Sequence, residues 1–141
     1  MTASTPRWSP ARCQFTLIAI TALIDRKLPS EEELEALAVG ARAVSMHELD
    51  VTTTQGWLRE VVAERNDDAA LKRRARRAIE DFPKDQAMRR AIYAHCADIA
   101  FADRTLKPSE RRFLRSVAKD LGLAHADQRK IDAVMDLKNR H

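Results

Sequence analysis

Four carboxylates occupy equivalent places in two repeated stretches of the chain. Asp25 and Glu31 belong to the first stretch, and Asp103 and Glu110 belong to the second. Carboxylate oxygens, with no His or Cys among them, are the ligands that suit Ca²⁺, Mg²⁺ or Mn²⁺ rather than Zn²⁺. If the two stretches face each other, the four side chains converge. The sequence then predicts a divalent-cation site.

The same residues have a structural interpretation that needs no ion. An Asp in a turn accepts backbone N–H bonds, and a Glu in the first turn of a helix is stabilised by the positive end of the helix dipole. Arg26 and Arg104 follow the two Asp residues directly and bring positive charge to the place where a cation would bind. Both interpretations stay open at this point.

The two stretches share one pattern along their length. Each has a buried helix, then Asp-Arg, one variable residue, Leu, Pro-Ser-Glu and an amphipathic helix; residues 103–110 carry one insertion relative to residues 25–31. A repeat of this kind predicts two pseudo-equivalent αα-hairpins joined by middle helices.

Apolar spacing predicts helices along the whole chain. Residues 15–24 and 87–102 are apolar on nearly every side, which is typical of buried helices. Start signals at Ser30, Asp67 or Asp68, Pro108 and Asp127 predict further helices, and another surrounds Trp57. With only 3 Gly and 5 Pro, the chain has too little turn material for a sandwich or barrel.

These features predict one all-α domain of about seven helices. The domain covers residues 13–141, and residues 1–12, with two prolines, are expected to form a flexible N-terminal arm. The longest apolar run is too short for a membrane span, which needs about 20 residues. With two cysteines and no visible targeting signal, we expect a cytoplasmic protein.

The second copy resembles the TerB-like domain of tellurite-resistance proteins. The resemblance rests on residues 97–103 through Glu110, on residues 114–123, and on the tail at 131–140. That family has two helical hairpins with Asp-Gly at each turn, and this chain has Arg in place of both glycines. The resemblance implies a non-enzymatic stress-response protein, acting as an adaptor or a divalent-cation-responsive module beside protein partners, which include membrane-associated ones.

Two further groups of residues are candidates for a site. Asp98 lies among apolar neighbours, where a carboxylate must be paired or join the acidic site of the second hairpin. Residues 66–141 carry 18 basic against 12 acidic residues. Much of that excess is a basic patch made of Lys72, Arg73, Arg74, Arg76 and Arg77.

The basic patch sits on one amphipathic helix without interleaved Gly or aromatic residues, so nucleic acid is not the favoured ligand. A docking surface for an acidic partner is preferred, and a nucleic-acid- or protein-binding regulator is the alternative function. No phosphate loop, Gly-flanked serine or metal-spaced Cys pair is present, so an enzyme is not expected. Cys13 and Cys96 fall in predicted buried helices, where thiols are inert.

Overall fold

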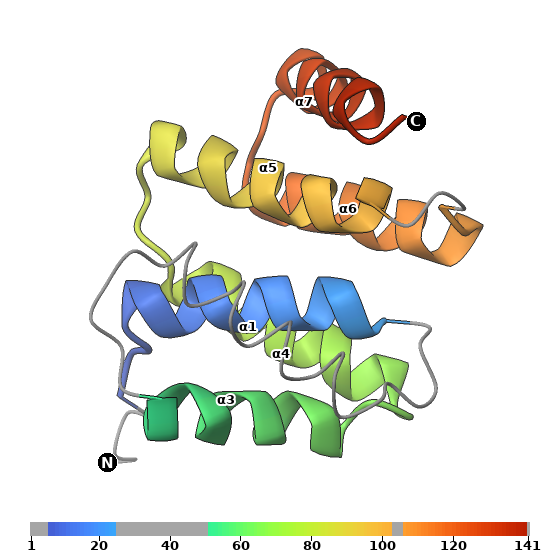
Figure 1. The fold of residues 1–141 in the computed structure, drawn as a ribbon. Coiled ribbons are helices and arrows are strands. Elements are labelled where there is room, and N and C mark those ends of the chain that lie inside the picture. Colours follow the sequence, from blue (N-terminus) through green and yellow to red (C-terminus); the bar gives the residue numbers. More distant parts are fainter. Residues whose placement is uncertain (1–5, 25–50, 103–105, 141) are drawn as a thin grey trace.

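The computed structural model describes residues 6–24, 51–102 and 106–140, which form six α-helices and no strand (Figure 1). The helices are α1 (Pro10–Leu23), α3 (Val51–Ala63), α4 (Asp68–Asp81), α5 (Gln86–Ala102), α6 (Pro108–Asp120) and α7 (His125–Lys138). The predicted all-α class is confirmed. The predicted helix after Ser30 lies outside the described residues, so the first of the two hairpins cannot be compared with the second.

Helix α1 is the centre of the fold. Every residue from 15 to 21 is buried, and α1 packs against α3, α4, α5 and α6. In Figure 1 it lies between α3 below and α5 above. Because its sequence is apolar on all sides, α1 can be stable only where other helices cover it on all sides. Phe15 also meets Trp57 of α3 edge to face, with 5.8 Å between ring centroids.

The structure corrects the extent of the predicted arm. Helix α1 already begins at Pro10, and the Ser9 hydroxyl accepts the backbone N–H of Arg12 at 3.2 Å. Ser followed by Pro is a helix start, because proline at the first helical position gives up a hydrogen bond that no partner would have made. The sequence places Pro10 in the expected arm, whereas in the structure it opens the buried helix.

Local signals account for the other helix boundaries. Asp67 caps α4, and its side chain accepts the backbone N–H of Ala70 at 3.0 Å. Gly122, with φ of +75°, closes α6, and the N–H of Leu123 reaches back to the carbonyl of Ala118. The last helix begins at His125, earlier than the predicted Asp127 cap.

Arg89 joins the ends of three helices. It lies in the first turn of α5, is only 7% exposed, and donates to no carboxylate among the described residues. Its guanidinium donates to four backbone carbonyls at 3.0–3.2 Å, those of Ile79, Phe82, Pro83 and Leu121. These carbonyls belong to the C-terminal ends of α4 and α6, where helix dipoles place negative charge. The guanidinium therefore takes the place of a capping group at both ends.

Replacing Arg89 by Met is expected to lower the free energy of unfolding by about 3 kcal/mol or more. The substitution keeps the aliphatic bulk but leaves buried carbonyls without a donor. Chemical denaturation of the variant against the parent measures the change. Arg90→Met alters the neighbouring, exposed arginine and is expected to stay within about 0.5 kcal/mol of the parent. Equal stability of the two variants would contradict this role for Arg89.

Candidate functional site

The structure describes Glu110 of the four predicted cation ligands, whereas Asp25, Glu31 and Asp103 lie outside the described residues. Glu110 is buried at the third position of α6, and its Oε1 accepts the backbone N–H of Lys107 at 3.4 Å. This contact caps the helix start, as in the structural interpretation. Within the described ranges there is no group of three or more His, Cys, Asp or Glu that could hold a metal. The cation site stays a prediction.

Asp98 is paired across two helices. Its Oδ2 accepts from Lys138 Nζ at 2.8 Å and its Oδ1 from Asn139 Nδ2 at 3.0 Å. Partial burial opposes ionisation, but the bonds from Lys138 and Asn139 outweigh it and hold the pKa of Asp98 below its usual value. The partner is a lysine from the end of α7 rather than one of the many arginines. Asp98 thereby ties α7 to α5.

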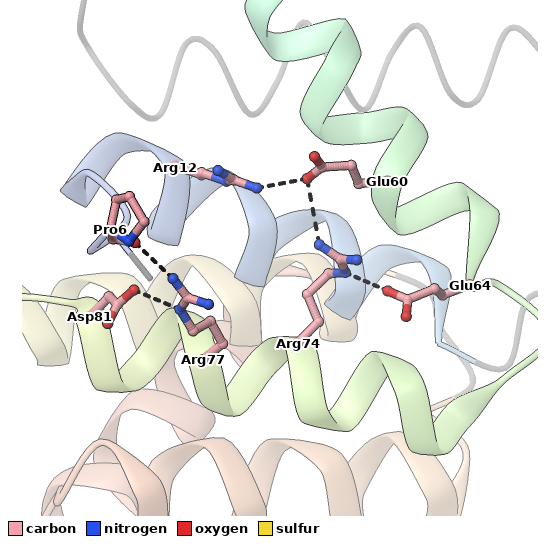
Figure 2. Close-up of polar contacts among 7 residues, drawn as sticks. All are labelled: Pro6, Arg12, Glu60, Glu64, Arg74, Arg77 and Asp81. Carbon is pink, nitrogen blue, oxygen red and sulfur yellow. Dashed lines mark hydrogen bonds and ion pairs between the residues drawn. The ribbon is translucent and has the colours of Figure 1, made fainter. Parts of the chain in front are cut away.

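The basic patch on α4 is divided between two sides of the helix. Arg74 faces α3, where it pairs with Glu64 and lies 3.5 Å from Glu60 (Figure 2). Arg12 of α1 also binds Glu60, at 2.9 Å. Three helices are thus connected by one network of alternating charges. Arg74 is occupied by this network and does not belong to a free cationic surface.

Arg77 bonds to Asp81 of its own helix and to the segment before α1. Its Nε donates to Asp81 at 2.9 Å and its Nη2 donates to the carbonyl of Pro6 at 2.8 Å (Figure 2). The guanidinium also lies 4.9 Å from the ring centroid of Trp8, and that of Arg12 lies 4.2 Å from it. The backbone N–H of Trp8 donates to Asp81 at 2.9 Å. We call this group of five residues the Trp8 clasp.

The remaining members of the basic patch, Lys72, Arg73 and Arg76, are exposed. None of them makes a hydrogen bond or ion pair with another described residue. Helix α6, which packs beside α4, adds the exposed Arg112 and Lys119. We call these five cations the α4–α6 basic face. A shallow pocket lies between the two helices, and Lys72 and Arg76 of α4 and Asp120 of α6 are among its lining residues.

The two cysteines offer no nucleophile. Both side chains are fully buried, and burial raises the pKa of Cys13 to about 12 and that of Cys96 to about 11. A thiol with such a pKa stays protonated at neutral pH and is a poor nucleophile. The prediction that Cys13 and Cys96 are buried and inert is therefore confirmed.

A comparison with protein-family models shows to which family the chain is related. The family model described as "Tellurite resistance protein TerB" matches residues 14–133, from within α1 to within α7. The chain belongs to the TerB family. No curated protein and no solved structure gives a significant match. The resemblance carried by the repeated stretches is confirmed, and this TerB chain is a tellurite-resistance-associated domain of a non-catalytic helical family.

Two features of this TerB domain were not predicted from its sequence. The Trp8 clasp was missed because its members are far apart in the sequence. A lone Trp in the expected arm was nevertheless a sign that this segment packs against the rest of the fold. Tyr93 is fully buried, and its hydroxyl donates to Asp132 of α7 at 2.6 Å. Among the described residues, no helix has the length and apolar character needed to cross a bilayer.

For Glu110, the helix-capping role predicts that Glu110→Gln lowers the free energy of unfolding by about 0.5–1 kcal/mol, since a charge at the helix start is lost. Thermal melting measures this, with and without Ca²⁺, Mg²⁺ or Mn²⁺. The ions are expected to leave the melting temperature of the TerB domain unchanged. An ion-induced rise that disappears in Glu110→Gln would instead support the four-carboxylate site.

For the Trp8 clasp, Arg77→Gln is expected to expose Trp8 and to cost about 1 kcal/mol, because a guanidinium–ring contact and an ion pair are lost. Acrylamide quenching of Trp8 fluorescence, in a Trp57→Phe background, reports the exposure. The adjacent exposed arginine supplies the matched control, Arg76→Gln, which should leave quenching unchanged. Equal quenching in both variants would contradict the clasp.

The same contact gives a pH dependence. The bonds from Arg77 and from the Trp8 N–H lower the pKa of Asp81 below its ordinary value of 3.8. A lowered carboxyl pKa contributes stability above the unfolded value, and that stability is lost as the pH falls through the lowered pKa. Quenching of Trp8 is therefore expected to be constant at neutral pH and to rise only below about pH 4.

Proposed function

We propose that this TerB domain is a non-enzymatic cytoplasmic adaptor in tellurite and related stress resistance, and that it docks an acidic protein through the α4–α6 basic face. A membrane-associated resistance protein with an exposed acidic surface fits the proposal as the partner. The family supports the setting, and the exposed cations of the face, three of which form no ion pair with a described residue, support the mode of binding. A divalent-cation response remains a separate proposal that rests on the four carboxylates.

The observation that carries the adaptor function is the difference between paired and unpaired arginines on α4. Arg74 and Arg77 form ion pairs inside the molecule, whereas Lys72, Arg73 and Arg76 are exposed and form no ion pair with a described carboxylate. Exposed cations of one sign on neighbouring helices attract and orient an acidic surface, and they do so at little cost to the fold. The exposed acidic residues of these two helices are Asp68, Glu80 and Asp120, and Asp120 lines the same pocket as Lys72 and Arg76.

The alternative is a basic helical regulator that binds nucleic acid. Its phosphate grip was predicted from a run of five basic residues, but the structure leaves three of them exposed and unpaired. Fewer available cations mean fewer phosphate contacts and a weaker, less salt-dependent affinity. This reduction favours a protein partner over a duplex.

The triple variant Lys72→Gln, Arg73→Gln, Arg76→Gln tests the adaptor function. Fluorescence anisotropy with a labelled Glu- and Asp-rich peptide is expected to show at least tenfold weaker binding than the parent, which corresponds to about 1.4 kcal/mol. Tellurite survival of the native host, with its own gene replaced by the variant, is expected to fall as well.

The matched control removes three exposed cations elsewhere, by Lys84→Gln, Arg90→Gln and Lys130→Gln. It has the same net charge as the triple variant and should bind the peptide and support survival like the parent. Loss of binding in both variants would mean that net charge alone acts, and would overturn the proposal. Binding of a duplex in preference to the peptide, with a steep fall in salt, would favour the regulator.

A further inference from the structure

A small cavity opens between α6 and α7, beside the end of α5. Its volume is about 270 Å³ when the open mouth is included. Phe101, Leu106 and Leu114 form its apolar part, and the polar part is lined by Arg111 and Arg115 of α6 and by Gln128 and Asp132 of α7. It lies on the side of α6 turned away from the pocket between α6 and α4, so it is separate from the α4–α6 basic face.

Two arginines of the cavity form no ion pair within the part of the chain that the structure describes. They lie one helical turn apart, and neither guanidinium makes a hydrogen bond or ion pair with another described residue. Both side chains are exposed at the mouth of the cavity, whereas the more buried arginines Arg74, Arg77 and Arg89 bond within the fold. Two cations at i and i+4 repel each other, and an anion held between them would reverse that effect.

The opposite wall cannot supply that anion. Asp132 already accepts the hydroxyl of Tyr93 at 2.6 Å, and Gln128 also contacts both groups. Burial raises the pKa of Asp132 above its ordinary value, although Tyr93, Arg111 and Gln128 each oppose the rise. Arg111 is thus near this carboxyl without forming an ion pair with it. Asp132 is held by Tyr93 and Gln128, and no described residue accepts a hydrogen bond from either arginine.

We propose that this cavity binds a single carboxylate group, with its oxygens held by Arg111 and Arg115 and its apolar neighbour against Phe101, Leu106 and Leu114. Guanidinium groups match the planar carboxylate in geometry. A dianion such as hydrogen phosphate would bring a second negative charge against Asp132. The apolar wall suits a carboxylate attached to an aliphatic group, either a free small acid or the C-terminus of a peptide.

The test titrates the full chain with N-acetyl-leucine, propionate and phosphate at one low ionic strength. The Nε–Hε signals of Arg111 and Arg115 are followed by ¹H–¹⁵N NMR. We expect both signals to shift saturably with the carboxylates, and phosphate to bind at least tenfold more weakly. Tighter binding of N-acetyl-leucine than of propionate assigns the site to a peptide C-terminus, and equal binding assigns it to free small acids; both support a carboxylate site.

The variant Arg111→Gln, Arg115→Gln is expected to lose at least tenfold in carboxylate affinity. The control Arg129→Gln, Lys130→Gln removes the same charge from exposed positions of α7 and should bind like the parent. Absence of saturable shifts in the parent, equal loss in both variants, or phosphate binding as tightly as the carboxylates would each overturn the proposal. None of these outcomes bears on the α4–α6 basic face, whose cations are unchanged in both variants.

Discussion

A buried guanidinium that is bonded only to backbone carbonyls fixes the arrangement of three helices. Arg89 donates to the carbonyls of two helix ends at once, so the end of α4 at Asp81 and the end of α6 at Asp120 must lie close to each other. Four carbonyl dipoles together substitute for a counter-ion. The relative position of α4 and α6 follows from this contact. The α4–α6 basic face and the cavity on the other side of α6 both depend on that position.

Much of the fold was predictable because its signals are local. An apolar surface on all sides identified α1 as buried, whereas α5, predicted in the same way, is buried on one side only. Asp67 and Pro108 marked the starts of α4 and α6. The repeated stretches led to the TerB family by the same kind of short-range pattern. A helical protein suits this approach, since most of its hydrogen bonds join residues four apart.

The candidate sites were harder to predict because their partners are distant in sequence. Periodicity places Arg74 and Arg77 on one side of α4. It cannot predict their partners on that side, which are Glu60, Glu64 and the carbonyl of Pro6. The role of Arg89 was also hidden in the sequence. An arginine at the start of a helix is usually a surface residue, and only the fold shows that the ends of α4 and α6 meet at this one. Asp98 was expected to be paired, yet only the fold identifies Lys138 as its partner.

Helix α7 differs from the rest in having no buried residue. It is held to α5 by the pairs Asp98–Lys138 and Tyr93–Asp132 and by the half-buried Ile131 and Met135. Polar ties with little apolar area make α7 the unit that opens first in native-state hydrogen exchange, without global unfolding. The cavity with Arg111 and Arg115 exists only while α7 is seated. Binding of the proposed carboxylate and the seating of α7 are therefore thermodynamically linked, and such a ligand is expected to slow amide exchange along the whole last helix.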